Sequence, residues 1–428
     1  MSNIIEIFKT ITKIQRCSGN HTPFIDFMQD FAKKHNYLCL VDDAKNILCK
    51  QNNSESKLIL QSHYDIVCLE CNKIPTIIED GDILKALDST LGADNGMGCS
   101  YMLGLMQEGF DCEFLFTSDE EIGLIGANNL SLEINSKYML NLDSEEEGEI
   151  CIGCAGGVDI KASFSNKKIV ANSDNLDLYE VSISNLAGGH SGVDIDKNIP
   201  NAIKLLIEFI VQNGAKVLDI NAGERINSIP ANAKAIIASN SFPKSNNDLI
   251  KIEKVDTKCE HFVEFDNSLF SYLNSFKNGV RDFNTTLNVV EDSINLALIK
   301  TTQDEIIVEF SARSMKNENL QNLKNETKKD LEDIGCSVET YGKYSAWTPD
   351  INDFTNKVLD IYKTYNSDAK LQAIHAGLEC AVFKEKFPNL KIASIGPTIN
   401  FPHSKKEQTS IKSCETLYKI VKDIVKSV

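Results

Sequence analysis

The segment Lys57–Asp65 constrains the fold of this chain more than any other. An apolar, strand-like run ends there in His63-Tyr-Asp65, a histidine and an aspartate two positions apart. On an extended backbone, residues i and i+2 point to the same face, so His63 and Asp65 are expected side by side where the strand stops. Ligands of α/β sheets bind at such carboxyl ends. A carboxylate often orients a metal-binding histidine, which makes Asp65 a candidate partner of His63.

An isolated His-x-Asp is more often a buried histidine near an acid, so the metal interpretation depends on the other predicted strands. These strands also end in polar, ionisable residues. The candidate residues at the strand ends and glycine-rich turns are Asp94 in Leu91–Gly98, Glu120 and Glu121 after Glu113–Thr117, Asp143 after Tyr138–Leu142, and His403 in the segment after Lys391–Ile395. Because strands alternate with helical patterns, the sequence predicts an α/β layer fold.

The length of 428 residues exceeds one ordinary hydrophobic core and indicates more than one domain. Near Asn175 the pattern changes to short strands, polar loops and a Lys- and Glu-rich helix, and after Trp347 it returns to strand and helix. We therefore expect residues 1–174 and 347–428 to form a catalytic domain, with 175–346 inserted as a lid or substrate domain.

Composition excludes several classes of partner. The net charge is −17 and no basic stripe is present, so nucleic acid and anionic membranes are not expected partners.

Thirteen cysteines, an odd number, and the lack of a signal-peptide pattern indicate free thiols in a reducing cytoplasm. The pairs Cys68/Cys71 and Cys151/Cys154 are expected to be packing thiols, because a zinc ribbon needs four thiolates in one compact unit.

Two histidines with an excess of carboxylates form a mixed nitrogen and oxygen ligand set that suits zinc, with Mn²⁺ or Co²⁺ as substitutes. Charge counting favours two ions, since three carboxylates and a bridging hydroxide would cancel four positive charges. Of the adjacent acids Glu120 and Glu121, one can bind metal while the other faces the water as a base. The spacing leaves open which is which.

Seven motifs, in order along nearly the whole chain, carry a resemblance to a known family. The sequence resembles the aminoacyl-histidine (Xaa-His) dipeptidases of the co-catalytic zinc metallopeptidase family that includes carboxypeptidase G and aminoacylase. The motifs are His63-Tyr-Asp65, Leu91-Gly-Ala-Asp94-Asn-Gly, Asp119-Glu120-Glu121-Ile-Gly-Leu-Ile-Gly126, Asn141-Leu-Asp143-Ser-Glu-Glu-Glu-Gly148, Gly153-Cys-Ala-Gly-Gly157, Gly188-Gly-His-Ser-Gly192 and His375-Ala-Gly-Leu-Glu379.

The resemblance implies a zinc-exopeptidase-like catalytic domain, with a central mixed sheet flanked by helices, and an inserted α+β lid domain. It also implies two zinc ions and assigns the site residues. His63 and Asp143 would hold one zinc, Glu121 and His403 the other, and Asp94 would bridge them. Glu120 would be the general base and Asp65 the partner of His63. The bond Asp94–Asn95 would be cis.

The same resemblance implies a short peptide substrate with a free carboxylate. His190 would stabilise the oxyanion, and Arg313 would bind the substrate carboxylate. Asn227 and His375 are further candidates for substrate contact. A homodimer is one assembly that the resemblance allows.

Other interpretations stay open at this point. The same catalytic centre serves N-acyl amino acid hydrolases and short-peptide carboxypeptidases, and a non-catalytic binding protein could inherit the scaffold. Arg313 could pair with a surface acid. A local hydrogen bond could explain both His375 and Glu379, which lie one helical turn apart. His21, His35 and His261 are expected at the surface.

Overall fold

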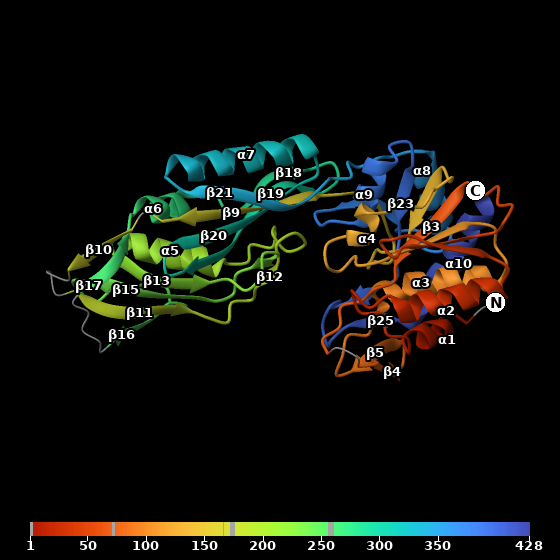
Figure 1. Ribbon diagram of the computed structural model, residues 1–428, viewed down its shortest axis with the longest axis horizontal. Helices are drawn as coiled ribbons and strands as arrows, with labels where there is room; N and C mark the ends of the chain where they lie inside the picture. The colour runs from red at the N-terminus through yellow and green to blue at the C-terminus, as the bar shows by residue number, and fades with distance from the viewer. Residues whose placement is uncertain (1–2, 71–72, 166, 172–175, 256–260) are drawn as a thin grey trace. The chain divides into compact units, whose positions relative to one another are not determined.

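The computed structural model describes residues 3–70, 73–165, 167–171, 176–255 and 261–428. The chain divides into two compact units, drawn in Figure 1. The first unit contains Met1–Cys154, Trp347–Ala373 and Leu378–Val428, and the second contains Ala155–Ala346 and Ile374–Gly377. Both combine sheets with helices, so the predicted α/β class, with a central mixed sheet and a second α+β domain, is confirmed.

The first unit is built on an eight-stranded mixed sheet. Its strands, in spatial order, are β1 (Leu38–Val41), β2 (Ile47–Lys50), β6 (Glu113–Thr117), β3 (Leu58–His63), β7 (Tyr138–Asn141), β23 (Lys391–Ser394), β8 (Glu149–Cys154) and β22 (Lys370–Ile374). The central strands β6, β3, β7 and β23 pair in parallel. β1 and β2 pair antiparallel with their neighbours, and β8 pairs antiparallel with β23.

Helices cover both faces of this sheet (Figure 1). Every residue of β3 and β6 is buried, as expected for parallel strands that are covered on both sides. The helices of the first unit are α1 (Ile4–Ile11), α2 (Thr22–Lys34), α3 (Ala93–Gln107), α4 (Ile125–Asn128), α8 (Asp353–Lys363), α9 (Glu379–Lys386) and α10 (Ile411–Ser427). A smaller sheet contains β24 (Ile399–Asn400), β25 (Gln408–Ser410), β5 (Ile83–Leu87) and β4 (Thr76–Asp80).

The second unit has its own core, formed between an antiparallel sheet and its helices (Figure 1). The main sheet contains β16 (Lys251–Val255), β11 (Asp177–Ile183), β15 (Ala233–Ser239), β13 (Lys216–Ala222), β19 (Val289–Thr301), β20 (Ile306–Ser314), β9 (Gly156–Phe164) and β21 (Ser337–Tyr344), with β18 (Gly279–Asn284) paired to β19. Two short pairs are β10 (Lys167–Ala171) with β17 (His261–Phe265) and β12 (Gly189–His190) with β14 (Ser228–Ile229). The helices are α5 (Ala202–Gln212), α6 (Ser268–Ser275) and α7 (Asn317–Asp333).

The first domain boundary differs from the expected one at residues 174 and 175. The second unit begins at Ala155, because β9 pairs along its length with β20 and β21 and so belongs to the sheet of that unit. The short segment Ile374–Gly377, expected in the catalytic domain, also belongs to the second unit and brings His375 with it.

One expectation about cysteines is wrong. Cys68 is not a packing thiol but forms a disulfide with Cys17, 51 positions earlier in the chain. Its motif partner Cys71 lies outside the described residues. Cys151 and Cys154 are buried in β8.

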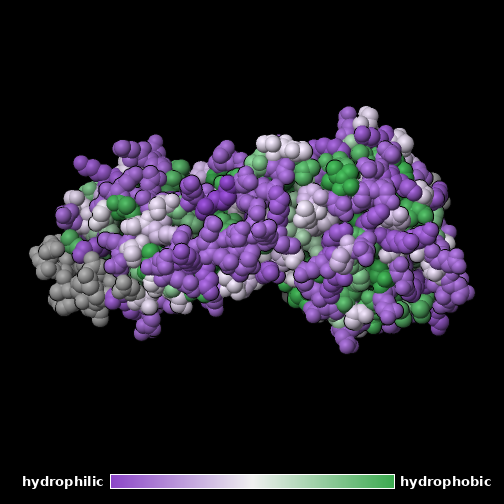
Figure 2. Space-filling view, turned by 90° about the horizontal axis from the view of Figure 1, so that it is seen from above, coloured by the Kyte–Doolittle hydropathy of each residue, from purple (hydrophilic) through white to green (hydrophobic). Residues whose placement is uncertain are grey.

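Hydrophilic residues cover most of the face shown in Figure 2. Among the described residues, no helix is both long and apolar enough to cross a bilayer.

The core of the second unit supplies a stability test. Phe310 is fully buried on β20 and lies edge-to-face with Phe276, at 4.9 Å between ring centroids. We expect Phe310→Ala to lower the free energy of unfolding by about 3–5 kcal/mol, because it removes buried apolar surface and leaves a cavity. Chemical denaturation followed by circular dichroism measures the loss. The exposed Phe242 of the same unit is the control, with a change of about 0.5 kcal/mol expected for Phe242→Ala; equal losses would contradict the assignment of Phe310 to the core.

Candidate metal centre

Three parallel strands deliver polar residues to one edge of the sheet in the first unit. β3 and β6 pair in parallel so that His63 lies opposite Thr117, just before the acids at positions 119–121. β7 pairs in parallel with β3 on its other side and is followed by Asp143. Because all three strands run in the same direction, their ends meet at the same edge, as the sequence predicts.

Asp94 lies between the two histidines. Its Oδ1 is 3.1 Å from Nε2 of His63, and its Oδ2 is 2.9 Å from Nε2 of His403. The residue sits in the non-helical first turn of α3, and the peptide bond between Asp94 and Asn95 is cis, as predicted. One carboxylate therefore contacts both imidazoles at once.

Each imidazole also contacts an acid of its own. Asp143 Oδ1 is 3.3 Å from His63 Nε2, and Glu121 Oε2 is 2.9 Å from His403 Nε2. The structure thus brings together the five predicted ligands, in the two groups that the resemblance implied. The side-chain amide of Asn95 holds Asp143 with a hydrogen bond of 2.5 Å to its Oδ1.

The charged groups of this cluster shift the pKa values of its two histidines. Burial lowers the pKa of His403, but hydrogen bonds that the ring donates to Asp94 and Glu121 outweigh this effect and raise the pKa to about 11. Burial opposes charge on His63 as well, yet Asp143 and its other acidic neighbours raise that pKa well above the ordinary value. Carboxylates that hold protons on imidazoles so strongly would attract a divalent cation in the same place.

The donor set fits such a cation. His63, Asp94 and Glu121 each offer a ligand atom within 4.8 Å of the others. Among the described residues, Oε1 of Glu121 is buried and has no hydrogen-bond partner, a costly arrangement unless something else binds it. Imidazole nitrogens with carboxylate oxygens are ligands that zinc accepts readily.

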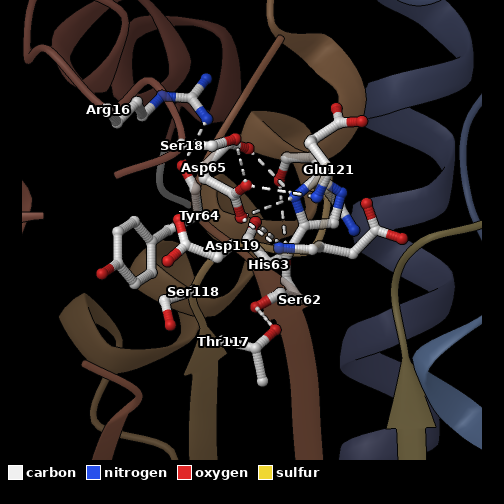
Figure 3. A network of polar contacts seen from close by, with 12 residues as sticks. Arg16, Ser18, Ser62, His63, Tyr64, Asp65, Thr117, Ser118, Asp119 and Glu121 are labelled. Carbon is white, nitrogen blue, oxygen red and sulfur yellow. Dashed lines mark hydrogen bonds and ion pairs between the residues drawn. The ribbon is translucent and has the colours of Figure 1, made fainter. Parts of the chain in front are cut away.

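Asp65 connects this cluster to the neighbouring loop (Figure 3). Its carboxylate accepts hydrogen bonds from the backbone N–H of Glu120 (3.0 Å) and from the hydroxyl of Ser18 (2.8 Å). His63 Nδ1 lies 3.6 Å from the carboxylate Oδ1 but only 3.0 Å from the main-chain oxygen of Asp65. Asp65 therefore holds the histidine with its backbone and the Glu120 loop with its side chain.

The pKa of Glu120 is shifted mainly by burial and by nearby charges. Burial raises the pKa of its carboxyl well above the ordinary range; the positive charge of His63 opposes this rise, and the charge of Asp143 adds to it. Such a carboxyl binds a proton strongly, which is a property of a general base or acid.

The remaining four predicted residues belong to the second unit. Nδ1 of His190 accepts hydrogen bonds from the N–H groups of Gly192 (3.2 Å) and Val193 (3.1 Å), which fixes the ring. The main-chain oxygen of Asn227 accepts the N–H of Ser191, so the Asn227 loop and the His190 loop are joined.

Arg313 and His375 are buried in the second unit. Nη1 of Arg313 donates to the hydroxyl of Tyr344 at 2.6 Å, and its Nε is buried without a partner among the described residues. Nε2 of His375 lies 2.7 Å from the hydroxyl of Ser293. Burial and then the charge of Arg313 lower the pKa of His375 to about 3, so this imidazole is neutral at neutral pH.

Two sequence-based interpretations are corrected. Glu379 does not bond to His375; its Oε2 accepts hydrogen bonds from Gln61 (2.6 Å) and Thr117 (2.7 Å) behind the metal-ligand cluster. His21 is not a simple surface residue, since Nε2 lies 3.1 Å from a carboxylate oxygen of Asp119.

Sequence reasoning also missed Arg16 and Glu407. Both are almost fully buried and hydrogen-bond to the main chain of the ligand-bearing segments. The sequence offered only one weak signal, the position of Glu407 four residues after His403.

A family model described as "Peptidase family M20/M25/M40" matches residues 59–427. The chain belongs to this family. It is therefore a hydrolase that acts on peptide bonds, and its family is metal-dependent.

Known relatives extend over the whole length of this M20-family chain. The "Cytosol non-specific dipeptidase" of Escherichia coli K12 is 29% identical, covering 99% of this chain and 97% of the relative. The crystal structure of aminoacylhistidine dipeptidase from Vibrio alginolyticus is 27% identical, with a TM-score of 0.82 over 99% of this chain and 96% of that one. Human carnosine dipeptidase 1, at 12% identity and a TM-score of 0.55 over 99% and 97%, shares the fold.

The buried acid behind the ligand cluster predicts a pH dependence of stability. Burial raises the pKa of Glu379 to about 8, above its ordinary 4.5. Between these values the folded protein keeps a proton that the unfolded chain has lost, so stability falls as pH rises through this window. We expect the free energy of unfolding of Glu379→Gln to decrease less with pH than that of the wild type. The difference in slope is at most about 1.4 kcal/mol per pH unit.

Denaturation of metal-free protein between pH 5 and 8 measures this effect, because bound cations would themselves lower the pKa. Parallel curves for the wild type and Glu379→Gln would contradict the protonated state of Glu379.

Proposed function

We propose that this M20-family chain is a two-zinc dipeptidase that hydrolyses the amide bond of dipeptides, of the Xaa-His type. The observation that carries the proposal is the shared contact of Asp94 with His63 and His403, each of which also contacts its own carboxylate. Two relatives support the substrate class, since one is named a non-specific dipeptidase and the other an aminoacylhistidine dipeptidase. Both names describe a dipeptidase, but they differ in the substrate specificity that they state.

We assign His63 and Asp143 to one zinc, Glu121 and His403 to the other, and Asp94 to both. Mn²⁺ or Co²⁺ could replace zinc on the same nitrogen and oxygen ligands. When bound, such ions lower the pKa of water to about 7 and polarise the scissile carbonyl.

Glu120 is assigned as the general base. Its carboxylate accepts the proton of the attacking water and returns it to the leaving amine. Asp65 positions this loop through the N–H of Glu120 and supports His63 through its main-chain oxygen. Asp65, which follows β3, would therefore support both the metal ligand His63 and the base Glu120.

In the second unit, Arg313 is assigned to the substrate carboxylate, because a guanidinium binds such a group with two parallel hydrogen bonds. His190 is assigned to the developing oxyanion, and Asn227 and His375 to substrate contact. A free carboxylate requirement restricts the enzyme to short peptides. The name of the E. coli relative supports a cytoplasmic location.

The role of Glu120 can be tested by Glu120→Gln, which keeps the size of the side chain but cannot accept the proton. We expect kcat to fall by about 10²–10⁴-fold, the usual contribution of a general base, while zinc content stays at the wild-type level. Exposed Glu146, in the loop between β7 and β8, is the control, and Glu146→Gln should leave kcat unchanged. Wild-type kcat in Glu120→Gln would show that another group is the base.

The substrate class can be tested with a panel of Xaa-His dipeptides, other dipeptides, tripeptides and N-acetylated amino acids. We expect cleavage of the dipeptides, loss of activity after chelation, and its return with zinc. Cleavage of the N-acetylated compounds alone would instead support the second candidate, an N-acyl amino acid hydrolase with the same catalytic centre.

A further inference from the structure

The turn that presents Asp94 is held by a buried carboxylate from the other end of the chain. Glu407 is 2% exposed and directs both oxygens at this turn. Oε2 accepts the backbone N–H groups of Leu91 (2.8 Å) and Gly92 (3.0 Å), and Oε1 accepts those of Ala93 (2.8 Å) and Asp94 (3.3 Å). Four consecutive residues, ending at the shared carboxylate, therefore hydrogen-bond to one side chain.

A buried guanidinium holds the same turn through its carbonyl group. Arg16 is 1% exposed, and its Nη2 donates to the main-chain oxygen of Gly92 at 2.7 Å. Its Nη1 donates to the main-chain oxygen of Tyr64 at 2.9 Å, as Figure 3 shows beside His63 and Asp65. The planar fork of one arginine thus joins the segment that carries His63 to the turn that carries Asp94.

The backbone around the turn leaves space for this arginine. Gly92 has a φ of +70°, and a Cβ atom there would lie 3.0 Å from Arg16 Nη2. A Cβ atom at Gly96 would overlap the same nitrogen. Both positions therefore need glycine for the guanidinium to reach the turn.

Glu407 and Arg16 have opposite charges and bind opposite polar groups of the turn. Burial raises the pKa of the Glu407 carboxyl to about 7, whereas its N–H donors favour the charged form, and cations bound nearby would favour it further. Since both oxygens accept hydrogen bonds, the geometry matches a carboxylate. We call these two residues the Arg16–Glu407 clamp.

The turn needs such support because Asp94 must keep two oxygens directed at two imidazoles. The neighbouring carboxylates of Asp143 and Glu121 repel Asp94, and a small rotation of the turn would break one of its two contacts. Glu407 lies four residues after His403, so the segment that supplies the second imidazole also holds the backbone of the shared carboxylate.

We propose that the Arg16–Glu407 clamp positions Asp94 and so sets the affinity of the site for its pair of divalent cations. This inference rests on the proposed function. In a purely structural role, the same residues would change the stability of the fold and leave cation affinity in the folded protein unchanged. The two roles therefore differ in a measurable quantity.

The test compares Glu407→Gln with a matched control. Glu113 is also 2% exposed, and its Oε2 accepts the backbone N–H groups of Asn135 (3.1 Å) and Ser136 (3.1 Å) at the opposite end of β6. Both variants remove one buried negative charge and keep the side-chain size. Zinc dissociation constants are measured on folded protein by competition with a chromophoric chelator, together with the zinc content per chain.

We expect Glu407→Gln to bind zinc about 10–100-fold more weakly, the usual effect of removing a group that orients a ligand, while Glu113→Gln stays within about twofold of the wild type. Wild-type affinity in folded Glu407→Gln would overturn the proposal. An equal loss in Glu113→Gln would also overturn it, since the effect would then be general. Failure of the wild type to bind any divalent cation would instead refute the proposed function.

Arg16 gives an independent comparison. Arg16→Lys keeps the charge but loses the planar fork, and Arg16→Met loses both. The expected order of zinc affinity is wild type, then Arg16→Lys, then Arg16→Met, and equal affinities would contradict the role of Arg16. If Arg16→Met does not fold, the comparison of folded Arg16→Lys with the wild type decides: weaker zinc binding supports the role of the planar fork, and equal affinity contradicts it.

Discussion

The contact of one carboxylate with two imidazoles is the constraint on which the candidate metal centre of the first unit depends. Asp94 contacts two histidines that are far apart in the sequence. His63 is the last residue of β3, and His403 lies 309 positions after Asp94. Parallel pairing of β3, β6 and β7 brings three of the five candidate ligand segments to one edge. The other two are the Asp94 turn and the C-terminal segment, which hydrogen-bond to each other. The fold thus serves mainly to bring distant segments to one point.

Gathering this many acids in a buried place is unfavourable, and the structure offsets the repulsion with main-chain groups rather than with surface ions. Asp65 accepts the N–H of Glu120, and Glu407 accepts four N–H groups of one turn. Asp94 and Glu121 instead direct carboxylate oxygens at the imidazoles, where cations would neutralise them. The same burial raises the pKa of Glu120, so a single environment favours both cation binding and proton transfer.

The strand-end residues were predictable from the sequence because apolar runs show where strands stop. β6 occupies Glu113–Thr117, the predicted segment, and His63 and Asp143 follow from the same pattern, whereas Asp94 was indicated by its glycine-rich turn. Arg16 and Glu407 were not predictable, because their partners are main-chain groups, which no side-chain pattern encodes. The boundary near residue 154 was missed for a related reason: β9 reads as a strand, but its partners β20 and β21 lie well over a hundred residues away.

The order of the ligands along the chain has a consequence for biosynthesis. His63 to Asp143 emerge early from the ribosome, whereas His403 and Glu407 follow only after the whole second unit has been made. Domains generally fold as units during synthesis, so a nascent chain would hold an incomplete set of candidate ligands until the segment of His403 has emerged. The complete set of candidate ligands would then assemble only after the second unit has been made, so any activity of this centre waits for that unit.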